Sequence, residues 1–250
     1  MQFTNLRALR ALKQRENAMT NYAGFDTDIH PGLAQLAWLK ANTNLRWCGY
    51  YLAPAPSHDN TSWMGQRQLL LAQGWGMAPI FVGQQTAGPG SHNAVGPQGS
   101  NDGSLAAELA SKEGFPPQSY IFLDWEDGSS PSQDAQAYVS AWATAVTESG
   151  YKPGIYCSHQ LAPGMATLIG QLNPTPALRI WAWKVATVAV HRYEGSIEGF
   201  PDSAPASCGY TAAIAWQCEQ NCELDLPGAP ITSMKADLSC ASVADPSAPP

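Results

Sequence analysis

The sequence carries little charge, and positive charge is the scarcer sign. Only 13% of its 250 residues are charged, and 13 Lys and Arg against 20 Asp and Glu give a net charge of −7. This balance excludes nucleic acid as the main partner, because a phosphate backbone is bound by concentrated positive charge. No apolar run approaches the roughly 18 residues of a membrane-spanning helix, so we expect no membrane span.

Motifs of several enzyme classes are also missing. The five histidines show no H-x-H or H-E-x-x-H spacing, so we expect no metal site. No G-x-S-x-G elbow of a serine hydrolase occurs. Gly88 and Gly90 lack the third glycine of a dinucleotide-binding loop, so no cofactor is expected. Cys157 precedes His159 by two residues in an apolar run, where a small buried cysteine is favoured over a thiol nucleophile.

What the sequence does contain is an alternation of short apolar runs with segments of helical length, which is typical of a parallel sheet or barrel. We therefore predict an α/β fold, a TIM-type (β/α) barrel whose last three strands have few helices. Four helices and one long glycine-rich loop, Gly83–Gly103, are expected between the runs. The helices are Leu33–Lys40, Ser62–Gln73, Leu105–Glu113 and a segment that begins at Ser130-Pro131 and ends at Gly150. The eight predicted strands are Tyr22–Asp26, Leu45–Leu52, Met77–Gln85, Ser119–Glu126, Lys152–Ser158, Arg179–Val185, Ala212–Cys218 and Ser233–Cys240.

The two ends of the chain are predicted to lie outside the barrel. Apolar residues at three-residue steps in 1–20 predict a short amphipathic helix, with a disordered leader as the alternative. The segment lacks the continuous apolar stretch of a signal peptide. Residues 21–242 are expected to form the barrel, and 243–250 a disordered tail.

Six cysteines are distributed unevenly. Cys48 and Cys157 lie in predicted strands, whereas Cys208, Cys218, Cys222 and Cys240 crowd the last part of the chain. Their irregular gaps do not fit the paired C-x-x-C spacing of a zinc site. We therefore expect at least one disulfide in this part, which would place the protein in an oxidising compartment outside the cytosol.

The fourth run changes from apolar to acidic at its end. Because side chains alternate along a strand, Asp124 and Glu126 project to the same side, about 7 Å apart along the chain. The carboxyl ends of barrel strands form the active-site face. Two close carboxylates can divide the tasks of general acid and ionised partner. The alternative is a helix-capping or loop carboxylate, a role that suits Asp127.

Two further acids are predicted to join this pair. The first run ends at Asp26, and the last run contains Asp237. These two strands become neighbours only when a barrel closes, so closure would bring the carboxylates together. Asp225 is a less favoured alternative because its surroundings read as a loop, and Asp28 fits turn chemistry before Pro31-Gly32.

Segments of five runs carry a resemblance to a known family. The chain resembles the family 25 glycoside hydrolases and, more narrowly, the glycoside-hydrolase-like, bacteriolysin-like domains once catalogued as of unknown function. The resemblance covers Tyr22–Ser242 and implies a barrel of five β/α units and three helix-poor strands. The segments are Gly24-Phe25-Asp26, Leu123-Asp124-Trp125-Glu126, Gly154-Ile155-Tyr156, Trp216-Gln217 and Ala236-Asp237-Leu238-Ser239.

The resemblance implies a lysozyme or muramidase activity, which cleaves the β-1,4 bond between N-acetylmuramic acid and N-acetylglucosamine in peptidoglycan. It implies that Glu126 is the general acid and that Asp124 stabilises positive charge or orients the substrate's acetamido group. Asp26 and Asp237 would shape the field around them. A carboxylate nucleophile needs two carboxyls about 5–5.5 Å apart and inversion needs about 6.5–9.5 Å, and both routes stay open. So do two other functions, a catalytically inactive barrel that binds cell-wall glycan and a glycosidase of another β-linked polysaccharide.

Aromatic residues in the predicted strands are candidates to stack on sugar rings, although core packing is an alternative for each. Peptidoglycan or a related polysaccharide lies outside the cytoplasm, so we expect a secreted, periplasmic or cell-wall site of action. Delivery would occur by lysis, by a dedicated secretion apparatus or from a precursor with a signal outside this sequence, and no delivery or immunity protein can be named. The substrate-binding candidates are Trp125, Tyr156, Trp181, Trp183, Trp216, Gln217 and Tyr50.

Overall fold

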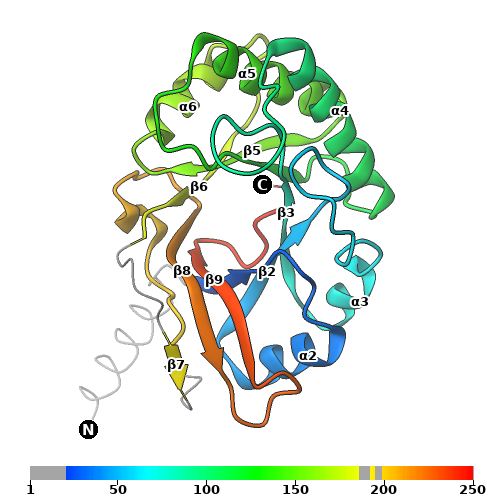
Figure 1. Cartoon of the computed structure of the whole chain (residues 1–250), viewed down its shortest axis with the longest axis vertical. Helices are drawn as coiled ribbons and strands as arrows, with labels where there is room; N and C mark the ends of the chain where they lie inside the picture. Colours follow the sequence, from blue (N-terminus) through cyan, green and yellow to red (C-terminus); the bar gives the residue numbers. More distant parts are fainter. Residues whose placement is uncertain (1–20, 186–191, 195–198, 250) are drawn as a thin grey trace, which may run out of the picture.

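The computed structural model describes residues 21–185, 192–194 and 199–249, and it forms a ring of strands with helices outside it (Figure 1). The expected N-terminal helix at 1–20 lies outside the described residues. The strands are β1 (Tyr22–Asp26), β2 (Leu45–Tyr51), β3 (Gly76–Phe81), β4 (Tyr120–Asp124), β5 (Lys152–Ser158), β6 (Arg179–Trp183), β7 (Arg192–Glu194), β8 (Ala215–Asp225) and β9 (Ser233–Ala241). The helices are α2 (Leu33–Asn42), α3 (Arg67–Ala72), α4 (Gly96–Lys112), α5 (Gln133–Glu148), α6 (Ala162–Gly170) and the short 3₁₀ helix η1 (Pro205–Cys208).

The strands close into a mixed barrel, which confirms the predicted fold class. β1 to β6 pair in parallel in chain order, and β6 then pairs in parallel with β8. β9 runs antiparallel to both β8 and β1 and closes the ring of eight strands. All eight predicted strands are present, and the structure adds β7, which pairs in parallel with the outer part of β8.

The barrel interior is filled by large aromatic side chains next to glycines. Trp47, Phe122 and Trp181 form one buried cluster in which Trp181 makes edge-to-face contacts with the other two. A Cβ at Gly24 would lie 2.1 Å from the indole of Trp47, so this strand position has no room for a side chain. The packed aromatics fill the barrel interior beneath its mouth.

Among the helices of the described residues, α4 and α5 make the most extensive contact, and glycines explain why. A Cβ at Gly99 would lie 2.2 Å from the carbonyl oxygen of Tyr138, and one at Gly103 would lie 2.6 Å from that of Trp142. These glycines belong to α4, so the expected loop Gly83–Gly103 is wrong in its second half. The glycines that suggested a loop instead let two helix backbones approach each other.

Other helix boundaries also differ from the prediction. α3 is shorter than the expected helix, and α6 was not predicted at all. α5 begins at Gln133, two residues after the expected first helical residue Pro131, and its cap is Ser132, whose hydroxyl accepts a hydrogen bond of 3.2 Å from the backbone of Ala135. Gly150 follows the helix with φ +86°, as a helix-ending glycine requires.

The segment after β9 is ordered, which corrects the expected tail at 243–250 for its described residues. Ser247 is buried and bonds to the backbone of Met77 and Tyr120. Arg179 donates a hydrogen bond of 2.7 Å to the carbonyl of Pro246. These contacts join the starts of β3, β4 and β6, so the segment covers the end of the barrel opposite the mouth. Figure 1 shows the C-terminal end within the ring.

The expected disulfide is wrong: all six cysteines are free and buried. The C-terminal cysteines are close in sequence because β8, β9 and η1 all contribute small apolar side chains to the core. Cys218, for example, contacts the carbonyl of Leu238 across the β8–β9 pair, with 3.4 Å between sulfur and oxygen. The cysteines therefore do not indicate an oxidising compartment.

Candidate active site

The acidic pair at the end of β4 has the predicted orientation. Asp124 is 6% exposed and ends the strand, whereas Glu126 lies two residues beyond and is exposed to solvent. Both line one cavity at the barrel mouth. The backbone here is held from the preceding loop, because Gln85 donates a hydrogen bond of 3.2 Å from its side chain to the carbonyl of Asp124.

A second acidic pair faces the first across the mouth. Asp26 lies directly opposite Asp237 in the antiparallel register of β1 and β9. Tyr51 donates a hydrogen bond of 3.1 Å to Oδ1 of Asp26. Asp237 accepts two bonds, of 2.9 Å from the amide of Gln217 and of 2.6 Å from the backbone N–H of Asn221. Closure of the barrel therefore brings together the four acids that the sequence singled out.

The four acids do not share one environment. Burial, together with the charge of the neighbouring acids, raises the pKa of Asp26 and of Asp124 well above that of an ordinary aspartate. Burial also raises the pKa of Asp237, to about 6, although its two hydrogen bonds oppose this. Oδ2 of Asp26 and Oδ1 of Asp124 are buried without a hydrogen-bond partner. These carboxyls are suited to hold a proton or to meet a donor group on a ligand.

Three adjoining cavities form a cleft across the barrel mouth. The central one, of about 40 Å³, contains all four acids. It shares Asp26, Tyr51 and Asp237 with a lobe of about 260 Å³ between β1 and the β8–β9 hairpin. It shares Glu126, Tyr156 and Gln220 with a lobe of about 200 Å³ beside β5 and β6. The acids thus lie in the middle of an elongated cleft.

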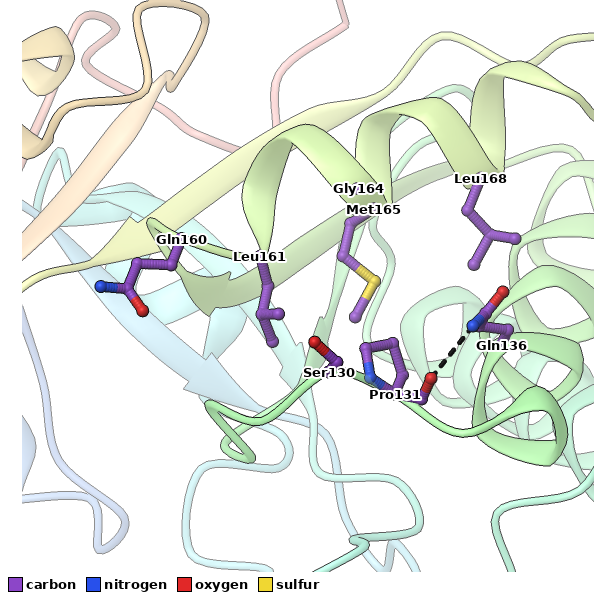
Figure 2. A pocket seen from close by; sticks show the side chains of 8 residues that line it. All are labelled: Ser130, Pro131, Gln136, Gln160, Leu161, Gly164, Met165 and Leu168. Carbon is purple, nitrogen blue, oxygen red and sulfur yellow. Dashed lines mark hydrogen bonds between the residues drawn. The ribbon is translucent and has the colours of Figure 1, made fainter.

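A larger cavity of about 360 Å³ lies elsewhere, between the loop after β4, α5 and α6 (Figure 2). Its walls combine Leu161, Met165 and Leu168 with the amides of Gln136 and Gln160. Figure 2 shows Gln136 bonded to the carbonyl of Pro131 at its edge, over 3.0 Å. No acidic or basic side chain lines this cavity, whereas four acids line the central cavity at the barrel mouth.

Four of the predicted substrate-binding residues lie at the cleft. Tyr156 lines the central cavity and one lobe, and its hydroxyl donates a hydrogen bond of 2.7 Å to Gln217. Trp181 forms part of the floor of the central cavity, and its indole N–H donates to Ser239 over 3.2 Å. Trp183 lines the lobe beside β6. The face of Trp183 is therefore the aromatic surface best placed to meet a ligand.

The other three predicted residues point away from the cleft and line none of its three cavities, which contradicts their prediction as substrate-binding residues. Trp125 is 1% exposed and packs against Tyr138 of α5. Tyr50 is fully buried on the outer face of β2, where its hydroxyl donates to Glu113. Trp216 donates to the carbonyl of Lys184 over 3.1 Å and packs against the outer core. Each lies one residue from a cleft residue, and alternation places neighbours on opposite faces.

Several cleft residues were missed by the sequence reasoning. Tyr51 lies beside Asp26. The alternation of side chains along β2 could have identified it as a residue that faces the cleft. Gln220 and Asn221 reach the cleft through irregular pairing of β8 between Gln217 and Cys222, where Asn221 adopts φ +55°. Such bulges redirect side chains. The polar Glu-Gln-Asn triplet between two cysteines was the only signal. Asp28 and Lys235 also line the lobe beside β1.

Two other properties of the described residues bear on function. They include no group of three or more His, Cys, Asp or Glu side chains placed to hold a metal ion. Within residues 21–185, 192–194 and 199–249, no helix has the length and apolar character needed to cross a membrane.

The comparison with protein families agrees with this geometry. Residues 37–204 match the Rv2525c-like, glycoside hydrolase-like domain. The chain belongs to this family. The match confirms the resemblance to glycoside-hydrolase-like domains drawn from the sequence. Among curated protein sequences, no significant match is found.

Solved structures show the same barrel at low sequence identity. The Tat-secreted protein Rv2525c of Mycobacterium tuberculosis has a TM-score of 0.54 and 13% identity, over 89% of this chain and 95% of that one. The catalytic domain of endolysin ply40 from the Listeria monocytogenes bacteriophage P40 has a TM-score of 0.55 and 12% identity, over 90% of this chain and 94% of that one. A family 25 glycosyl hydrolase from Bacillus anthracis has a TM-score of 0.53 and 12% identity, over 90% of each chain. The glycoside hydrolase-like domain thus shares the fold of lysozyme-type catalytic domains.

Proposed function

We propose that this glycoside hydrolase-like domain is a peptidoglycan-cleaving hydrolase of the lysozyme or muramidase type. It would cleave the β-1,4 bond between N-acetylmuramic acid and N-acetylglucosamine. The observation that carries the proposal is the position of Asp124 and Glu126 at the end of β4, opposite Asp26 and Asp237, in the middle of an elongated cleft. The likeness to an endolysin domain and to a family 25 glycosyl hydrolase supports the substrate class.

Glu126 is assigned as the general acid. Its carboxyl lines the central cavity and the lobe beside β6, so it adjoins the junction between two sugar positions. In the reaction its proton passes to the glycosidic oxygen while the bond from that oxygen to C1 breaks. The sugar then carries the positive charge, and the leaving sugar departs as a neutral alcohol.

Asp124 is assigned as the second carboxylate of the reaction, which assists the bond cleavage that Glu126 begins. Its Oδ1 is buried and has no hydrogen-bond partner in the protein, so an acetamido N–H of the substrate would supply one. That bond would orient the acetamido oxygen toward C1, or the carboxylate would stabilise the developing charge directly. Water then completes hydrolysis and returns a proton to Glu126.

The proposed substrate also fixes where the protein would act. Peptidoglycan lies outside the cytoplasm, and the structural relative Rv2525c is described as Tat-secreted. We therefore place the activity of this chain in the periplasm, the cell wall or the medium.

The proposal is tested by digesting purified peptidoglycan with the intact protein and with Glu126→Gln. Mass spectrometry of reductively labelled fragments is expected to show new muramic-acid reducing ends from the intact protein alone. Glu148→Gln is the matched control, because Glu148 is exposed at the end of α5, far from the cleft in the fold. Its digestion pattern is expected to equal that of the intact protein.

Three results would contradict the proposal or a part of it. Equal release by the intact protein and Glu126→Gln would exclude Glu126 as the acid. No release, with both proteins still sedimenting with the cell wall, would establish a glycan-binding barrel without turnover. Release from another β-linked polysaccharide alone would keep the chemistry and replace the substrate.

A further inference from the structure

The charges that line the cleft are almost all of one sign. Its three cavities are lined by five carboxylates and by a single cation among the described residues, Lys235. Lys235 is therefore the one described group of the cleft whose charge attracts an anionic substituent, although Asp26, Asp28 and Asp237 line the same lobe. The carboxylates are those of Asp26, Asp28, Asp124, Glu126 and Asp237.

The fold places Lys235 on the cleft side of β9. Lys235 is exposed, and its neighbours Met234 and Ala236 are buried on the opposite face of the strand. Because side chains two residues apart share a face, Lys235 follows Asp237 along the cleft, about 7 Å farther from the barrel. Strand β9 pairs with β8 at this position, where Lys235 lies opposite Glu223, and with β1 from Asp237 onward. The position of this charge relative to the acids is thus set by the sheet.

Lys235 lies in a lobe that is suited to a single sugar unit. The lobe measures about 260 Å³, which is below the roughly 300–1,000 Å³ of pockets that enclose whole drug-sized ligands. Its other walls offer Thr27 and Asn221 as polar neighbours for hydroxyl or amide groups. It also adjoins the central cavity, with which it shares Asp26 and Asp237. A sugar here would be next to the one that meets the catalytic acids.

We propose that this lobe is the subsite for a sugar that carries a carboxylate substituent, and that Lys235 binds this carboxylate. The inference rests on the proposed function, for which the substituent is the lactyl-peptide arm of N-acetylmuramic acid. A uronic acid would offer the same chemistry from another polysaccharide. Lys235 thereby fixes the register of the glycan, because every second sugar carries the carboxylate and Lys235 is the single cation among the described residues that line the cleft.

The test measures binding, so that it does not depend on turnover. In the Glu126→Gln background, Lys235→Glu, Lys235→Met and Lys235→Arg are titrated with soluble, uncross-linked peptidoglycan strands. The same strands are used after amidation of their carboxylates, and hyaluronan serves as the uronic-acid probe. Lys112→Glu is the matched control, because it changes the net charge equally at the end of α4.

Lys235→Glu is expected to weaken binding of native strands at least about tenfold and Lys235→Met severalfold, with affinity restored in Lys235→Arg. On amidated strands the variants should bind alike, and the salt dependence seen with native strands should be lost in Lys235→Met. A uniform loss on both kinds of strand, as from a damaged fold, would overturn the proposal. No loss on either would do the same.

The outcomes also separate this inference from the proposed function. Binding to peptidoglycan that depends on Lys235, without cleavage by the intact chain, would support the subsite and contradict the hydrolase. Binding to hyaluronan that depends on Lys235, with none to peptidoglycan, would support the subsite and reject muramic acid as its occupant. Cleavage of peptidoglycan that is indifferent to Lys235 would retain the hydrolase and reject the subsite.

Discussion

Asp26 and Asp237 lie opposite each other at the seam where the first and last barrel strands pair, and the pKa of each carboxyl is raised. Raised pKa values mean that the folded protein binds protons more tightly than the unfolded chain does. The free energy of unfolding therefore falls as pH rises from about 4, through the value of about 6 for Asp237, and the protein is more stable below this window than above it.

Replacing one member of this pair should remove the penalty. Asp26→Asn is expected to raise the free energy of unfolding at pH 7 by about 1–2 kcal/mol, because an amide has no charge and can donate to Asp237. At pH 4 the change should be close to zero. Urea unfolding at both pH values checks this, with the exposed Asp59→Asn as the control. A loss of stability at pH 7 would show that the charged pair is already compensated.

Two helical glycines provide a matched test of helix packing. Gly99→Ala in α4 would push its Cβ into the backbone of Tyr138, and we expect a loss of more than about 2 kcal/mol. Gly164→Ala in α6 meets no atom within 4 Å, so helix propensity alone should raise stability by about 0.5–1 kcal/mol. Thermal unfolding of both variants gives the comparison. Equal effects would contradict the close approach of α4 and α5.

Two tryptophans distinguish ligand contact from core packing. Trp183→Ala is expected to weaken binding of peptidoglycan strands about tenfold with little change in melting temperature, since the side chain lines a cleft lobe. Trp125→Ala should instead destabilise the fold by about 3–5 kcal/mol, because its side chain is buried against α5. Binding titrations and melting curves of both variants are the measurement. A binding defect for a folded Trp125→Ala would reverse the assignment.

The free thiols can be counted directly. Burial raises the pKa of the Cys157 thiol to about 12 and shields all six cysteines, so none should react with Ellman's reagent within minutes in the folded protein. All six should react in guanidinium without a reductant. Fewer than six reactive thiols in the unfolded chain would restore a disulfide.

The barrel and its acids could be predicted because their signals are local and repeated. Short apolar runs ended in acids at Asp26 and Asp124, and closure of a barrel then required Asp237 to meet Asp26. The seam strand β9 turned out to be antiparallel, so Asp237 lies within the strand and not at its carboxyl end. The pairing was predicted correctly although the direction of the strand was not.

The predictions that were wrong concern features that composition and local pattern do not determine. Tyr50 and Trp125 were chosen by residue type, but strand parity places them on the outer face. The glycines of α4 looked like a loop because their partner, the backbone of α5, is distant in sequence. Asn221 reaches the cleft through an irregularity in strand pairing that no local pattern announces. Tertiary contacts decided each of these positions.

The antiparallel seam between β1 and β9 affects how the protein folds as it is synthesised. β1 is among the first parts of the barrel to leave the ribosome, yet one of its edges has no partner until β9 has followed more than 200 residues later. Such distant pairing makes folding slow, and the open edge can join another chain in the meantime. Barrel closure therefore waits until β9 has been synthesised, and a chaperone that covers the β1 edge until then would favour closure over aggregation.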